Sequence, residues 1–194
     1  MRSLSGARGI RVKGGNSHGA TQKRTAARLI APEQMVCEQA PVPEPKVGEV
    51  LIKAELAAIC GSDLHVVYQG QVHTTDGAAH YPCPHGYPGH EGLGTVVASK
   101  AASHKVGTRV LCTPIAATSA TFGEYQVLPA SQAIPLPAYD GPAEHLLMAQ
   151  QFGTTIFALR QNPVDVVGKT VLVMGQGSAG NFFAYNLKRA GAAK

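Results

Sequence analysis

Two short segments of this chain carry side chains that together can bind a transition metal. Residues 60–65 read Cys-Gly-Ser-Asp-Leu-His, and residues 89–91, further along the chain, read Gly-His-Glu. The thiolate of Cys60 and the imidazole of His90 are ligands that suit Zn²⁺. A zinc ion with three protein ligands and one open position acts as a catalytic centre. The two segments therefore predict a catalytic zinc site.

Three further polar side chains in these segments can support such a site. Asp63 can accept a hydrogen bond from the second ring nitrogen of His90, which would fix the tautomer of the ring. Ser62 can hydrogen-bond the oxygen of a substrate, and His65 can carry a proton outward. A single cysteine or histidine is more often structural than metal-binding. The hypothesis therefore depends on the joint pattern and not on any one residue.

A glycine-rich motif near the C-terminal end, residues 175–180, predicts a dinucleotide-binding turn. It reads Gly-Gln-Gly-Ser-Ala-Gly, and the glycines allow a tight turn, close approach of a pyrophosphate and close packing of the following helix. The free N–H groups at the start of that helix attract phosphate. The candidate cofactor-binding residues are Gly175, Gly177, Ser178, Ala179 and Gly180. The residue that separates NAD from NADP lies about 20 positions further, so the sequence through Lys194 leaves both open.

The first metal-binding segment directly follows a predicted strand. Residues 49–59 alternate between apolar and polar types, as a half-buried strand does, and lead into Cys60. His90 begins another strand, so a β-fold can bring both ligands to one cleft. Further strands are expected at 94–99, 108–113 and 124–128. Residues 61–89, rich in Gly, His, Tyr and Pro, are expected to form a loop over the cleft, and its part 66–88 to line a substrate pocket with Phe152.

The pattern changes type after Pro142. Apolar residues at helical spacing predict a helix over residues 143–160. Residues 170–174 form a short apolar run typical of a buried parallel strand. Residues 178–189 predict a second helix, with Gly191 as its stop signal. A strand, a glycine-rich turn and a helix are the opening of a dinucleotide-binding domain.

Composition excludes several classes of protein. The chain of 194 residues is 44% hydrophobic, and it contains no run of about 20 apolar residues, which a membrane span needs. The four cysteines are irregularly spaced and follow no secretory signal, so a disulfide framework is not expected. A reducing, cytoplasmic location follows as the expectation.

The net charge of +5 comes from one end of the chain. Residues 1–24 carry six basic side chains and no acidic one, whereas the remainder carries eleven basic and twelve acidic. A nucleic-acid-binding protein needs its basic residues on a folded face, and here they lie on a Gly- and Ser-containing stretch. We expect residues 1–24 to be a basic disordered leader, and a cleaved transit peptide is the alternative.

Taken together, the motifs resemble those of a known family. The shared features run in order along the chain: Cys-Gly-Ser-Asp-x-His, Gly-His-Glu-Gly-x-Gly, Val-Gly-Thr-Arg-Val at 106–110, Phe-Gly-Glu-Tyr at 122–125, and the glycine fingerprint. From about residue 25 to the end, this resembles the N-terminal portion of the zinc-dependent medium-chain alcohol dehydrogenases. Alcohol dehydrogenase is itself a known example of catalytic zinc with three protein ligands.

The resemblance implies a mixed α/β fold. A chaperonin-10-like antiparallel β-domain that binds zinc would span residues 25–164. The first strand and helix of a truncated Rossmann domain would occupy residues 165–194.

The resemblance also implies a role for each site residue. Cys60 and His90 would be zinc ligands, Glu91 a carboxylate near the metal, and Ser62 with His65 a proton relay. The third ligand of the family lies in the helix near residues 148–153, where this chain has neither a thiol nor an acid. Gln150 is the best-placed substitute, and it would leave the site with a net charge near +1 and a stronger Lewis acid. Alternatively, Glu91 becomes the ligand and restores neutrality.

We expect one catalytic zinc and no structural zinc. The family's four-cysteine lobe is missing, because no cysteine lies between Glu91 and Arg109. His80, Cys83 and His85 match no standard zinc spacing.

The sequence thus predicts a zinc-dependent, NAD- or NADP-linked alcohol dehydrogenase. Such an enzyme transfers hydride between an alcohol or aldehyde and nicotinamide. Nucleic-acid and membrane partners are not expected, and the full-length protein is a candidate homo-oligomer. If the chain really ends at residue 194, the alternative is a catalytically inactive zinc-binding fragment or interaction module.

Overall fold

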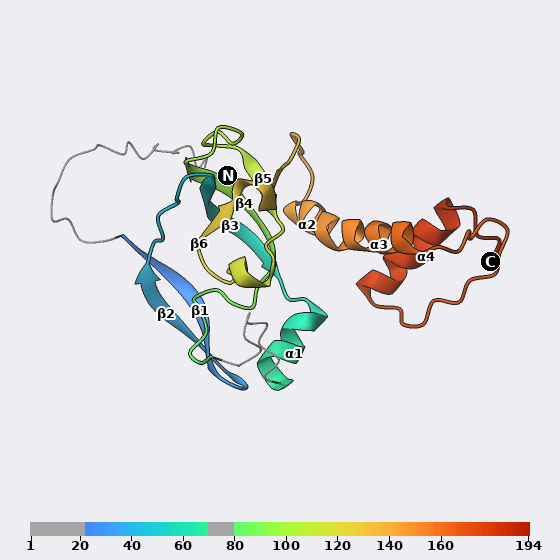
Figure 1. Ribbon diagram of the computed structural model, residues 1–194, viewed down its shortest axis with the longest axis horizontal. Coiled ribbons are helices and arrows are strands. Elements are labelled where there is room, and N and C mark those ends of the chain that lie inside the picture. The colour runs from blue at the N-terminus through green and yellow to red at the C-terminus, as the bar shows by residue number, and fades with distance from the viewer. Residues whose placement is uncertain (1–21, 70–79) are drawn as a thin grey trace, which may run out of the picture.

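A five-stranded antiparallel sheet forms the centre of the N-terminal part of the molecule (Figure 1). The structure is a computed structural model, and it describes residues 22–69 and 80–194. The strand order is β6-β3-β4-β5-β7. The bounds are Glu49–Ala58 (β3), Glu91–Ser99 (β4), Arg109–Cys112 (β5), Tyr125–Pro129 (β6) and Ala133–Pro135 (β7). The four strands predicted from alternation in the sequence are therefore confirmed, and β7 adds a short edge strand.

The sheet curls around a core of aliphatic side chains. β3 and β6 place alternate residues on this inner face, as the period of two in their sequences requires. The buried cluster consists of Val50, Ile52, Val96, Val110, Cys112, Leu128 and Ala133. Two irregularities in the β3–β4 register, between Leu51 and Ile52 and between Ala54 and Leu56, bend the sheet.

A β-hairpin precedes the sheet and packs beside it. It consists of β1 (Lys23–Ala31) and β2 (Gln34–Pro41). Lys23 and Arg24, which composition assigns to the leader, begin β1. Arg24 is buried, and its guanidinium donates to the carbonyl oxygen of Tyr125 across the fold. The rest of the predicted leader, residues 1–21, lies outside the described residues.

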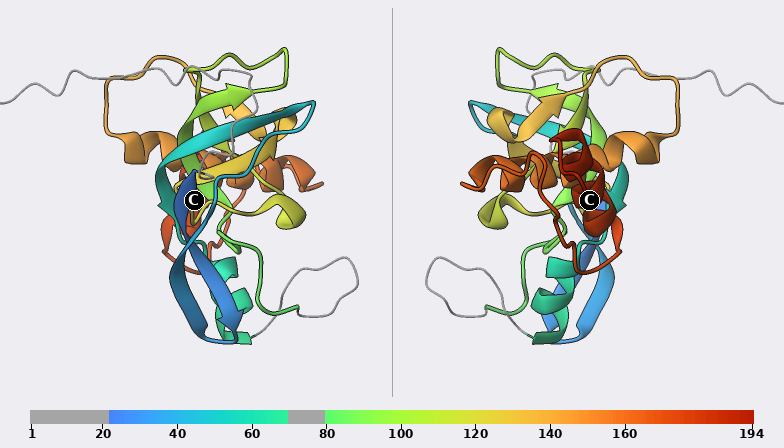
Figure 2. Two further views of the ribbon diagram at one scale, coloured as in Figure 1. Left: turned by 90° about the vertical axis from the view of Figure 1, so that its left-hand side faces the viewer. Right: turned by 90° about the vertical axis from the view of Figure 1, so that its right-hand side faces the viewer.

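The expected loop over residues 61–89 is in part a helix, so that expectation was wrong. Helix α1 (Gly61–Gln69) follows Cys60 directly. Its buried residues Asp63 and Val66 lie three positions apart, on one face. Figures 1 and 2 show α1 at the same end of the molecule as the tip of the β1–β2 hairpin, where Glu33 N–H donates to the carbonyl of Val67 at 2.8 Å.

The C-terminal part is helical and extends away from the sheet (Figure 1). The predicted helix over 143–160 is confirmed, but it is interrupted at Met148 and forms α2 (Ala143–Leu147) and α3 (Ala149–Gln161). The helix predicted over 178–189 is α4 (Ser178–Arg189). α3 and α4 pack together through the ring of Phe152, which lies 5.3 Å from the ring of Phe182. A buried hydrogen bond of 2.9 Å joins Asn186 to Thr155.

Residues 170–174 are not a regular strand, which corrects the prediction of a buried parallel strand. The side chains of Leu172 and Met174 are 83% and 88% exposed. Two backbone hydrogen bonds do run in the parallel sense, from Ala193 N to Lys169 O and from Val171 N to Lys194 O. The segments on the two sides of α4 thus run parallel without forming strands, and the described residues hold too few strands to bury residues 170–174.

No helix in residues 22–69 and 80–194 combines the length and the apolar character required to cross a bilayer.

Candidate metal centre

Three side chains with metal-binding atoms meet where β3 ends and β4 begins. One ligand atom each from Cys60, His90 and Glu91 lies within 4.8 Å of the others. The sheet register explains this meeting, because Ala58 at the end of β3 pairs with Glu91 at the start of β4. The residues just beyond the two strand ends are therefore neighbours, although they are 30 positions apart in sequence.

Asp63 contacts both Cys60 and His90. Its Oδ2 accepts a hydrogen bond of 2.8 Å from the Cys60 N–H, and its Oδ1 lies 3.0 Å from Nδ1 of His90. This second contact is a close ion pair, and the carbonyl of Pro88 lies 3.3 Å from the same nitrogen. With Nδ1 facing these oxygens, Nε2 of His90 is the nitrogen that remains for a metal.

The electrostatics of this corner favour a protonated ring when no metal is present. The carboxylate of Asp63, assisted by Cys60, raises the pKa of His90 to about 9, against an opposing effect of burial. A metal ion must displace this proton before it binds the ring.

Ser62 and His65 lie on the exposed side of α1, one turn apart. The hydroxyl of Ser62 is 3.4 Å from Nε2 of His90. His65 Nδ1 instead contacts Oε1 of Gln69 at 3.0 Å. Among the described residues, no hydrogen bond joins Ser62 to His65. Of the two residues of the predicted proton relay, Ser62 thus lies beside His90, whereas His65 lies on the surface of α1.

A hollow of about 200 Å³ opens beside His90. It is lined by Ser62, Asp63, Val66, Tyr87, Pro88, His90, Pro114 and Ser119. Val66, Tyr87 and Pro88 fall within the segment expected to shape a substrate pocket. Pro114 and Ser119, which lie between β5 and β6, were not predicted, because they belong to none of the motifs in the sequence.

Gln150 lies at a second hollow. This cavity of about 460 Å³ has Leu111, Thr113, Ile134 and Phe157 among its lining residues. Gln150 is not among the residues that line the hollow beside His90. Phe152, expected at the substrate pocket, packs against α4 instead, because its ring contacts Phe182 and Tyr185.

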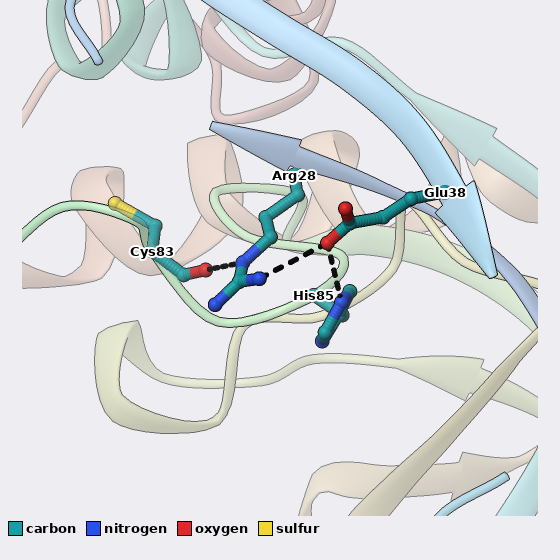
Figure 3. Close-up of polar contacts among 4 residues, drawn as sticks. All are labelled: Arg28, Glu38, Cys83 and His85. Atoms are coloured by element: carbon teal, nitrogen blue, oxygen red, sulfur yellow. Dashed lines mark hydrogen bonds and ion pairs between the residues drawn. The ribbon is translucent and has the colours of Figure 1, made fainter. Parts of the chain in front are cut away.

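Cys83 and His85 do not belong to the cluster of Cys60, His90 and Glu91, and each contacts other residues. The buried thiol of Cys83 donates to the carbonyl of His80 at 3.6 Å, and burial raises the pKa of the thiol. His85 Nε2 contacts Oε1 of Glu38 at 2.7 Å, and the same oxygen lies 3.1 Å from Nη1 of Arg28 (Figure 3). The hydrogen bonds from Arg28 and His85 lower the pKa of the Glu38 carboxyl.

The predicted dinucleotide-binding turn has the backbone geometry that its glycines allow. Gly175 has a φ of 95°, which favours glycine. A Cβ at Gly180 would overlap the carbonyl of Gly175, so these two segments can approach only without side chains. Gly177 precedes the first turn of α4, which contains Ser178, Ala179 and Gly180. The turn therefore presents the free N–H groups of a helix start.

The chain is similar in sequence to a family of known enzymes. Residues 46–138 match the family described as "Alcohol dehydrogenase GroES-like domain". L-threonine 3-dehydrogenase of Xanthomonas campestris pv. campestris is 32% identical over 184 residues, which cover 80% of this chain and 51% of that enzyme. The chain thus spans about half the length of the curated relatives it matches.

Solved structures agree with this match. 2R,3R-Butanediol dehydrogenase from Bacillus subtilis superposes with a TM-score of 0.72 at 25% identity, over 87% of this chain and 56% of that one. A Sinorhizobium meliloti protein described as a zinc-binding dehydrogenase, bound to NADP, has the same TM-score at 23% identity, over 89% of this chain and 55% of the other. The predicted resemblance and fold class are confirmed.

Proposed function

Since residues 46–138 match the family described as "Alcohol dehydrogenase GroES-like domain", we propose that this chain supplies the catalytic zinc centre of an NAD(P)-dependent alcohol dehydrogenase. The observation that carries the proposal is the meeting of Cys60, His90 and Glu91 within 4.8 Å.

The three donors fit a zinc ion. Zinc bonds of about 2.0–2.3 Å in a tetrahedron separate the ligand atoms by about 3.3–3.8 Å, so the observed cluster needs to contract only slightly. A thiolate and a carboxylate together balance the charge of Zn²⁺. Glu91 is our preferred third ligand over Gln150, because its carboxylate lies within 4.8 Å of the ligand atoms of Cys60 and His90.

Bound zinc would polarise the substrate oxygen and lower the pKa of its proton. The residues of this chain would do the remaining work. Asp63 holds the ring of His90 with Nε2 toward the centre, and it also holds the backbone of Cys60. The Ser62 hydroxyl, 3.4 Å from that nitrogen, would accept the proton from the substrate as it gives its own proton to His65. His65 would pass it to solvent after releasing Gln69.

The substrate would be a small alcohol or the matching carbonyl compound. The hollow beside His90 has a volume of about 200 Å³, which equals the liquid volume of about seven water molecules and suits a small molecule. The names of the similar proteins, L-threonine 3-dehydrogenase and 2R,3R-butanediol dehydrogenase, both specify small secondary alcohols. The nicotinamide cofactor would bind at the turn before α4.

Metal analysis of the purified protein tests the proposal. We expect about one zinc per chain, lost in Cys60→Ala. Cys37→Ala is the matched control, because Cys37 is an exposed thiol in β2, and it should retain the metal. Zinc in neither or in both variants would contradict the assignment.

The third ligand is tested by two further variants. Glu91→Gln should lower zinc affinity, since it removes a charged ligand, whereas Gln150→Ala should leave it unchanged. The opposite result would assign the role to Gln150.

A second candidate function is zinc binding without turnover by the 194 residues alone. The exposure of Leu172 and Met174 favours it, because a dinucleotide-binding sheet needs more strands beside them. For a protein of these residues, we predict no measurable binding of NAD(P)H in a fluorescence titration. If this protein bound NAD(P)H and also oxidised a small alcohol, the result would support the dehydrogenase hypothesis instead.

A further inference from the structure

We propose that Glu38, on the β1–β2 hairpin, is a positioning residue for the metal centre. Through Arg28 and His85 it fixes the segment 83–90, which ends in the ligand His90. This inference rests on the proposed zinc site.

The first step is the pair of contacts that one carboxylate oxygen makes. Oε1 of Glu38 accepts from Nη1 of Arg28 at 3.1 Å and from Nε2 of His85 at 2.7 Å (Figure 3). Hydrogen bonds to a charged acceptor are stronger than neutral ones. Glu38 therefore holds one partner from its own hairpin and one from the segment before His90.

Arg28 extends this contact to the backbone of the segment. Its Nε donates to the carbonyl of Cys83 at 2.9 Å, and Figure 3 shows the guanidinium between that carbonyl and the Glu38 carboxylate. On either side, Cys83 N donates to Leu29 O at 2.8 Å and Gly86 N to Ala27 O at 2.7 Å. Strand β1 thus fixes the path of the chain from Cys83 to Gly86.

The path from Gly86 to the metal ligand is short and hydrogen-bonded. Gly86 O accepts from Gly89 N at 3.1 Å, and Gly89 O accepts from Thr121 N at 3.0 Å. His90 follows directly. A shift of residues 83–86 would therefore move the imidazole relative to Cys60, whose position depends on β3 and α1.

The chain offers a matched control in Glu55. This carboxylate also pairs with an arginine, Arg109, at 2.8 Å, and its side chain is 33% exposed against 38% for Glu38. It joins β3 to β4 and β5 through Thr95 and Arg109 and has no contact with segment 83–90 among the hydrogen bonds and ion pairs of the described residues. Glu55→Ala therefore reports the effect of losing a surface ion pair, whereas Glu38→Ala also removes the contact with segment 83–90.

The test compares Glu38→Ala with Glu55→Ala in the full chain. Zinc affinity is measured by competition with a chromophoric chelator, and Co²⁺ is substituted to record the visible absorption spectrum. In Glu38→Ala only, we expect zinc binding to be about tenfold weaker and the Co²⁺ spectrum to be shifted. A tenfold loss is the lower end of the range found when residues that support metal ligands are mutated. Glu38→Gln keeps an acceptor oxygen, so this variant should retain most of the zinc affinity and a Co²⁺ spectrum close to that of the wild-type protein.

Hydrogen exchange of the metal-free protein supplies a readout that does not depend on zinc. The amides of Cys83, Gly86 and Gly89 should exchange faster in Glu38→Ala than in Glu55→Ala. Equal affinity, spectra and exchange in the two alanine variants would overturn the positioning role while leaving the zinc site intact. If the wild-type protein binds no zinc, the proposed function fails, and with it the role of Glu38 at a metal centre.

Discussion

The contact between Asp63 and His90 determines the chemistry of the candidate centre at the scale of single residues. One carboxylate holds the backbone of one ligand and the ring of another. Removing it should therefore disturb both ligands at once, which a contact with a single ligand would not do.

This contact predicts how the stability of the metal-free protein depends on pH. The pKa of His90 is raised from 6.5 to about 9 in the folded state, mainly by Asp63. Protonation therefore favours folding, and this contribution is complete below about pH 6.5 and is lost as the pH rises through about 9. Urea unfolding in EDTA should show lower stability at about pH 10 than at about pH 7.

The Asp63→Asn substitution removes the charge that raises the pKa of His90. The free energy of unfolding of this variant should therefore change less between about pH 7 and about pH 10 than that of the wild-type protein. An equal pH dependence in the two proteins would show that other groups cause it.

The cysteines predict a pattern of chemical reactivity. Cys37 is exposed and Cys60 half-buried, whereas Cys83 and Cys112 are buried; burial raises the pKa of both buried thiols, that of Cys112 to about 12. Because the thiolate is the reactive form, iodoacetamide should modify only Cys37 and Cys60 in the folded protein. Zinc should protect Cys60 alone, as peptide mass spectrometry would show. Protection of Cys37 would contradict the assigned ligand.

Much of the residue-level site could be predicted from the sequence, because its members lie in two short motifs. The contact of Asp63 with His90 and the meeting of Cys60, His90 and Glu91 follow from motif spacing and strand pairing. Glu38 and His85 could not be predicted in the same way. They are 47 positions apart and meet only because the hairpin packs beside the segment before His90.

At the scale of elements, the segment before His90 depends on one glycine. Gly86 has a φ of 90°, and a Cβ there would overlap the carbonyl of Ala120. Gly107 has the same φ of 90°, with nothing within 4 Å of its Cβ position. A residue with a Cβ would thus meet the same backbone strain at both positions, but it would find different amounts of space.

Alanine at these two positions should have unequal effects. Gly107→Ala should lower the free energy of unfolding by about 1 kcal/mol, as expected for a non-glycine residue at positive φ. Gly86→Ala should cost clearly more, about 2 kcal/mol further, because backbone atoms must also move. Urea denaturation measures both, and equal losses would show that the segment can relax around the new methyl group.

The elements that alternate in sequence were predictable, and those set by tertiary contacts were not. Strand β3 follows its period of two and ends where expected. Helix α1 was missed, since its glycine, serine and histidine content resembles a loop and its helical face depends on the burial of Asp63 and Val66. The apolar residues 170–174 read as a buried strand, yet a strand forms only beside partners.

At the scale of the whole molecule, those exposed apolar residues predict self-association. Leu172 and Met174 project from a segment with few backbone partners, which is a template for pairing with another chain. In a protein of these 194 residues, Leu172→Lys should reduce light scattering at high concentration. Val47→Lys is the control, because Val47 is 92% exposed but lies outside this segment. An equal effect of the two lysines would point to net charge as the cause.

The order of the site along the chain has a consequence for biosynthesis. Cys60, His90 and Glu91 precede residue 92, and the last strand of their sheet ends at Pro135, whereas the predicted dinucleotide-binding turn begins at Gly175. Because chains emerge from the ribosome N-terminus first and fold by units, the proposed metal pocket of the nascent chain can close before this turn is translated. Zinc capture would then be a cotranslational event, completed before any nicotinamide can bind.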